Sequence, residues 1–164
     1  MHPAARPLNS GVRPMSSYTF EIDHYLSEDE IVELADRCYP YLEAISARYA
    51  PEIDIEDGFP EKPEYFDVLR TSWLLDKSND RPPHEDLVAG LGFGFGLLLG
   101  ARTPLRWCAA TDAYGDFVTM ARDPEGGPKA SVPVFGYVEK RETLQNAEVF
   151  VDFFKQVSSD IVGT

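Results

Sequence analysis

The stretch HEDLVAGLGFGFGLLLG, residues 84–100, decides the fold of this chain. Five glycines interrupt it, but its leucines keep a helical spacing, no strand pattern precedes it and no lysine follows it. A nucleotide phosphate loop needs glycines after a strand, so we predict a helix instead. Gly92, Gly96 and Gly100 lie four residues apart and predict a flat face that lets another backbone come close. Each interior glycine costs about 1 kcal/mol relative to alanine, so tight packing must compensate for that loss.

Two further helices are expected before this stretch. Ser27 and Glu30 form a capping box, which begins a helix that the apolar spacing carries to about residue 49. Pro40 lies inside this pattern and predicts a kink or a break, because proline removes one backbone hydrogen bond and clashes with the preceding turn. A second helix is expected at about 64–77.

The pattern changes after the glycine-rich helix. Strands are expected at 105–111, 117–122 and 131–138, with Pro133 indicating an edge strand, and a last helix is expected at about 143–158. The fold class is therefore α+β: N-terminal helices, a three-stranded antiparallel β-meander, and a C-terminal helix packed on it.

Length and composition bound the class of protein. A chain of 164 residues suits one domain, which we place at 18–164 after a flexible tail at 1–17. A net charge of −13 argues against nucleic-acid binding and against anionic membranes. The N-terminus has no apolar core typical of a secretory signal, so we expect a cytoplasmic protein whose Cys38 and Cys108 are buried free thiols.

The negative charge is concentrated in one part of the chain. Residues 17–67 hold fifteen carboxylates and three basic side chains. The cluster at 28–36 is largely explained by helix capping and the helix dipole. The cluster at 52–67, seven acids against Lys62 alone, has no such explanation and predicts a partner-binding surface. We expect its carboxylates to contact a basic protein, with two aromatic residues as apolar anchors: Glu52, Asp54, Glu56, Asp57, Glu61 and Glu64, with Phe59 and Tyr65.

No pattern in the chain indicates catalysis, a metal or a cofactor. The histidines have no partner at metal-ligand spacing, and His-Glu-x-x-His, Cys-x-x-Cys and Gly-x-Ser-x-Gly are all absent. Asp112 and Asp116 flank a predicted turn but lack the further oxygens of a calcium loop. Cys108 has no obvious histidine to make it a nucleophile. We therefore predict a protein that is not an enzyme, with no catalytic residue, no metal site and no cofactor.

The segment from Gly90 to Phe154 resembles a bacterial family filed as "domain of unknown function 3806". The resemblance is carried by a small-residue helix, a tryptophan-containing strand, an Asp-x-x-Gly turn, a following strand and a proline-containing strand before a last helix. In this chain these are Gly92 to Gly100, Trp107, Asp112 with Gly115, Phe117 to Ala121, and Val132-Pro133 leading to Lys140-Arg141. The resemblance implies no catalytic residues. In charge and size alone the chain is also similar to immunity proteins of bacterial toxin systems.

Two functions follow as hypotheses. The first is an acidic immunity protein that neutralises a cationic bacterial toxin by direct contact, without nucleic-acid or membrane partners. The alternative is a regulatory module that binds a small ligand or builds an oligomer through the glycine-rich helix and the meander. A pocket among Trp73, Trp107 and Tyr114 would favour this alternative.

Overall fold

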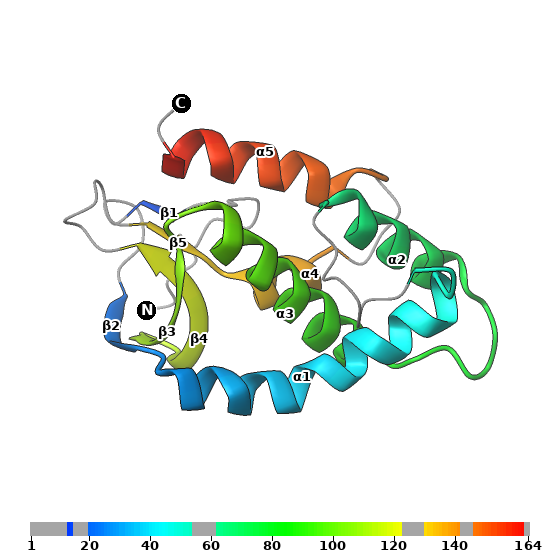
Figure 1. Ribbon diagram of the computed structural model, residues 1–164, viewed down its shortest axis with the longest axis horizontal. Coiled ribbons are helices and arrows are strands. Elements are labelled where there is room, and N and C mark those ends of the chain that lie inside the picture. Colours follow the sequence, from blue (N-terminus) through cyan, green and yellow to red (C-terminus); the bar gives the residue numbers. More distant parts are fainter. Residues whose placement is uncertain (1–12, 15–19, 54–61, 123–129, 142–145, 163–164) are drawn as a thin grey trace.

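The protein combines helices with one antiparallel sheet (Figure 1), in a computed structural model that describes residues 13–14, 20–53, 62–122, 130–141 and 146–162. The helices are α1 (Glu28–Tyr49), α2 (Glu64–Leu75), α3 (His84–Arg102), α4 (Val134–Glu139) and α5 (Val149–Val162). The strands are β1 (Arg13–Pro14), β2 (Glu21–Tyr25), β3 (Arg106–Asp112), β4 (Gly115–Arg122) and β5 (Ala130–Val132). No helix in these ranges is both long and apolar enough to cross a bilayer.

The sheet has the order β1-β5-β4-β3-β2, with all neighbours antiparallel. The predicted meander is present as β3, β4 and β5, with Cys108 opposite Thr119 and Ala121 opposite Ser131. The prediction of three strands was wrong, because β2 pairs with β3 and β1 pairs with β5. Part of the predicted tail, Arg13–Pro14, therefore belongs to the sheet.

The third predicted strand was also too long. β5 ends at Val132, and residues 134–139 form α4 where a strand had been expected. Proline has no N–H for a strand ladder but suits a helix start, and the Pro133 carbonyl accepts the first helical hydrogen bond from the Tyr137 N–H at 2.8 Å. The last helix begins later than predicted, at Val149, because the Asn146 side chain accepts a hydrogen bond from the Glu148 N–H at 2.9 Å and holds a turn there.

The start of α1 is as predicted. The Ser27 hydroxyl accepts from the Glu30 N–H at 3.2 Å, and Glu30 accepts from the Ser27 N–H at 2.9 Å. The Ser27 bond is also the main reason why the pKa of Glu30 is lowered. The helix is not broken at Pro40, although Figure 1 shows its axis turning about midway. Buried Cys38, Leu42 and others on the inner face hold both halves against α3, which offsets the lost backbone bond.

Helix α3 lies at the centre of the molecule, between α1 and α5 and beside the sheet (Figure 1). At most of its glycines the nearest neighbour is a side chain of another element and not its backbone. A Cβ at Gly92 or Gly96 would fall 2.4 Å from the rings of Phe135 or Trp107, so these positions accommodate aromatic rings. The backbone approach that the sequence predicted occurs instead at Gly90, which faces α1. The glycines at 90, 92, 94 and 96 lie on different sides of the helix and are all buried, so α3 is packed on nearly all sides.

Candidate functional site

The structure describes only part of the predicted partner-binding surface. Glu52 and Glu64 are exposed. The other carboxylates of that prediction and Phe59 lie outside the described residues: Asp54, Glu56, Asp57 and Glu61. Tyr65 is described, and it is buried in the core with its hydroxyl hydrogen-bonded to Ser46. Tyr65 was therefore the wrong choice for an anchor, because it lies on the face of α2 that packs inward.

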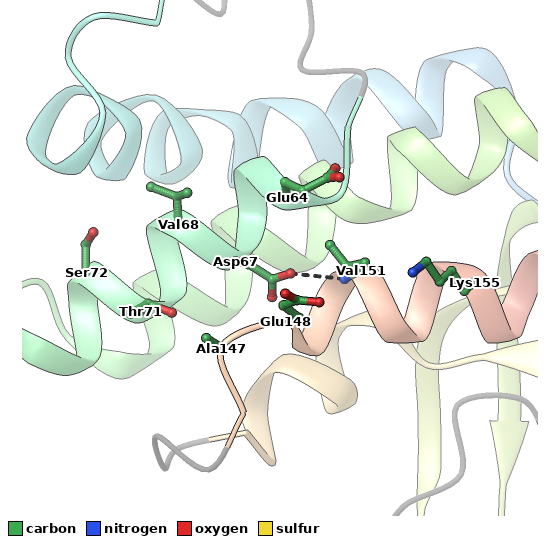
Figure 2. A pocket seen from close by; sticks show the side chains of 9 residues that line it. All are labelled: Glu64, Asp67, Val68, Thr71, Ser72, Ala147, Glu148, Val151 and Lys155. Carbon is green, nitrogen blue, oxygen red and sulfur yellow. Dashed lines mark hydrogen bonds between the residues drawn. The ribbon is translucent and has the colours of Figure 1, made fainter.

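Glu64 stands at one end of a groove between α2 and α5 (Figure 2). The groove has a volume of about 540 Å³. Helix α2 supplies residues that recur at helical spacing on its outer face, and α5 and the turn before it supply the other wall. The lining is Glu64, Asp67, Val68, Thr71 and Ser72 from the first wall, with Ala147, Glu148, Val151 and Lys155 from the second.

Asp67 joins the two walls of the groove. Only 6% of its surface is exposed, and its two carboxylate oxygens accept hydrogen bonds from the N–H groups of Phe150 (2.7 Å) and Val151 (3.0 Å). These N–H groups belong to the first turn of α5, where a carboxylate is stabilised by the helix dipole. Burial nevertheless raises the pKa of Asp67 to about 6, and the nearby Glu148 carboxylate adds to that rise. Asp67 is thus both the cap of α5 and the deepest acid of the groove.

Arg70 lies one helical turn from Asp67 and is 2% exposed. Its guanidinium donates to the carbonyl oxygens of Arg141 (3.1 Å) and Asn146 (3.0 Å), which ties α2 to the chain before α5. Burial lowers the pKa of Arg70, and the charge of Asp67 opposes that shift. This pair of buried charges was not predicted from the sequence. The available signal was spacing, since Arg70 falls on the inward face of α2 between Phe66 and Trp73.

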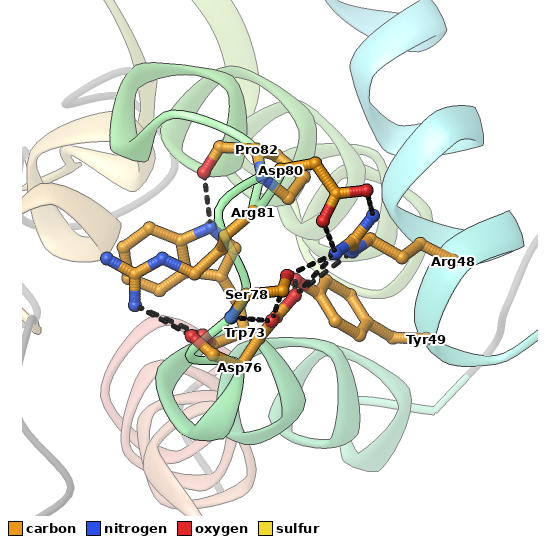
Figure 3. Close-up of polar contacts among 8 residues, drawn as sticks. All are labelled: Arg48, Tyr49, Trp73, Asp76, Ser78, Asp80, Arg81 and Pro82. Carbon is orange, nitrogen blue, oxygen red and sulfur yellow. Dashed lines mark hydrogen bonds and ion pairs between the residues drawn. The ribbon is translucent and has the colours of Figure 1, made fainter.

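A second polar cluster fastens the end of α1 to the connection between α2 and α3 (Figure 3). Arg48 Nη2 lies 2.9 Å from Asp76 Oδ2 and 3.0 Å from Asp80 Oδ1. The Tyr49 hydroxyl donates to Asp76 at 2.6 Å. Hydrogen bonds from Ser78 and Tyr49, together with Arg48, hold the pKa of Asp76 well below its usual range. Arg48 already pairs with both carboxylates of this cluster. We therefore interpret the cluster as a structural link between α1 and the connection that follows α2.

The three aromatic residues proposed for a pocket do not surround one cavity in the described part of the chain. The Trp73 indole N–H donates to the Pro82 carbonyl at 2.8 Å, and the Arg81 guanidinium carbon lies 3.9 Å from the centre of the Trp73 ring (Figure 3). Trp107 stacks on Phe93 in the core. Tyr114 is 53% exposed and lines a separate hollow of about 220 Å³ at the turn between β3 and β4.

Within the described ranges no three His, Cys, Asp or Glu side chains gather closely enough to hold a metal. Cys38 and Cys108 are free and buried, as predicted, and burial raises the pKa of the Cys38 thiol.

Comparison with known proteins gives no relative: no family model, curated protein or solved structure matches the chain. The resemblance of residues 90–154 to the family of unknown function therefore stays a prediction.

Proposed function

We propose that this chain is a non-catalytic acidic binding protein that neutralises a cationic bacterial toxin by direct contact. The observation that carries the proposal is a surplus of exposed carboxylates without cations. In the described part of 20–64, the ion pairs are those of Glu30 with His24 and of Arg48 with Asp76 and Asp80. Other acids of that region are exposed and form no ion pair with the described residues: Glu28, Asp29, Glu33, Asp36, Glu43, Glu52 and Glu64.

Such a surface favours a basic protein partner. Uncompensated carboxylates attract cations over the Debye length and repel phosphate groups of nucleic acids and anionic lipids. Complementary charge would mainly speed association and fix the orientation of the complex. A toxin with a basic cleft would be covered by this surface and so prevented from reaching its substrate.

A rescue assay tests the proposal. The gene next to this one is expressed in a bacterial host alone and together with this chain. We expect the neighbouring product to arrest growth alone and growth to be restored when this chain is present. A neighbouring product that is harmless, or that remains toxic in the presence of this chain, would contradict the proposal.

The role of charge is tested on the association rate with that purified product. Glu64→Lys should slow association several-fold and weaken its dependence on salt, because it removes the complementary charge at the contact. Glu139→Lys is the matched control. Glu139 is also exposed but lies outside the acidic region, and its substitution changes the net charge by the same amount. Equal effects of the two substitutions would show that only the overall charge matters.

A further inference from the structure

We propose that the groove between α2 and α5 is the binding site for an arginine side chain carried by a basic segment of the partner. This inference rests on the proposed function and names the part of the surface that makes the contact. Among the residues that line the groove, Glu64, Asp67 and Glu148 are acids and Lys155 is the single base. The cavity of about 540 Å³ has room for one long side chain and the backbone beside it.

The arrangement of the acids favours a cation between them. Figure 2 shows Asp67 directed toward α5 with Glu148 beside it, and Glu64 at the start of α2. Burial is the main cause of the raised pKa of Asp67; the Glu148 charge adds to it, and the charge of the buried Arg70 opposes it. Asp67 thus has a cation nearby, and a guanidinium in the groove would be attracted mainly by the Glu148 and Glu64 carboxylates. Glu148 and Glu64 are exposed and form no ion pair with the described residues, so both remain available to such a group.

The rest of the lining fits the stem of a long basic side chain. Val68 is 49% exposed on the α2 wall, and Ala147 and Val151 lie on the other wall. Lysine and arginine cover apolar surface with their methylene groups and keep the charged end in polar surroundings. Thr71 and Ser72 add hydroxyl acceptors. Arginine has five N–H donors in a planar fork, against three on a lysine ammonium, so it satisfies more of these acceptors.

An anionic ligand does not fit the same groove. The N-terminus of a helix often binds phosphate, but in α5 the Asp67 carboxylate already occupies the N–H groups of Phe150 and Val151. The remaining lining acids would repel an anion, and Lys155 alone would not balance them.

A peptide titration tests the groove without the natural partner. The probe is an acetylated penta-arginine peptide, and penta-citrulline serves as its uncharged isostere, with backbone amide shifts followed by NMR. We expect the arginine peptide to shift amides mainly in 64–72 and 147–155, and the citrulline peptide to leave them unchanged. The absence of shifts there, or equal shifts along α1, would overturn the proposal.

Matched double variants separate the groove from overall charge. Glu64→Gln with Glu148→Gln should weaken peptide binding at least tenfold. Glu33→Gln with Glu43→Gln removes two exposed carboxylates from α1 instead and should change binding less than twofold. All four side chains are exposed and form no side-chain hydrogen bond with the described residues, and circular dichroism checks that both variants fold. Equal weakening by the two double variants would overturn the proposal.

The rescue assay then distinguishes the two proposals. If the wild-type chain rescues growth and Glu64→Gln with Glu148→Gln rescues equally well, the groove is not the contact, while the proposed function stands. If the peptide binds in the groove but the wild-type chain does not restore growth, the toxin hypothesis fails, while the groove is still an arginine-binding site.

Discussion

Replacing Gly90 by alanine tests whether the glycines of α3 are required for its packing. A Cβ at this position would lie 2.8 Å from the Leu42 backbone nitrogen and 3.0 Å from its Cα. Carbon atoms prefer separations of about 3.5–4.0 Å, so α1 and α3 would have to move apart. The obstacle is the backbone of another helix, which cannot turn away as a flexible side chain can.

The expected size of this effect follows from two opposing contributions. Alanine gains about 1 kcal/mol over glycine inside a helix, and Gly90 does not have the positive φ that would forbid a side chain. Overpacking a core costs about 1–3 kcal/mol, and contact with rigid backbone places Gly90→Ala near the upper end. We expect a net loss of about 2 kcal/mol, which lowers Tm by about 4–8 °C in a chain of this length.

The same substitution at Gly100 is the control. A Cβ there meets nothing nearer than the Met120 methyl at 3.6 Å, an ordinary contact, and the residue is exposed. Gly100→Ala should therefore stabilise the protein by up to about 1 kcal/mol. Both variants are measured by chemical denaturation followed by circular dichroism. If Gly90→Ala were as stable as the wild type, close packing at Gly90 would not be what holds α1 and α3 at this separation.

Three further predictions concern polar and thiol groups. The pKa of Asp67, about 6, lies above its unfolded value near 4, so the folded state holds this proton more tightly and the contribution of Asp67 falls as pH rises from about 4 to 6. That difference corresponds to about 3 kcal/mol. Denaturation at pH 4, 5, 6 and 7 should show that decline in the wild type and not in Asp67→Asn, and identical pH profiles would contradict the assignment. Tyr49→Phe removes the 2.6 Å hydrogen bond to Asp76 and should lower the free energy of unfolding by about 1 kcal/mol. An unchanged free energy of unfolding would show that this bond does not stabilise the fold. Cys38 and Cys108 should react with a thiol reagent only slowly until denaturant is added, since both are buried; rapid labelling of the native protein would show that one of them is accessible.

Local signals in the sequence were enough to predict several elements. The capping box at Ser27 and Glu30 concerns atoms three residues apart, and the apolar spacing of α2 and α3 repeats within a few turns. The turn between β3 and β4 likewise depends on Gly115, whose φ of 124° suits glycine. These features depend on neighbours in the chain, so sequence patterns could reveal them.

Other features depend on which segments meet in space. β2, with the sequence EIDHY, is mostly polar and becomes a strand because β3 offers it an edge. Tyr65 was predicted to be an anchor on a partner-binding surface, but the rotation of α2 against its neighbours buries it.

The acidic character of this protein was determined by its sequence alone, because net charge needs no coordinates. The arrangement of those charges was decided by tertiary structure. Asp67 and Glu148 are far apart in sequence and meet only because Asp67 caps α5 across the groove. A sequence pattern shows which charges a chain carries, whereas the packing of α2 against α5 decides which of them face a common cavity and which lie buried beside a compensating cation.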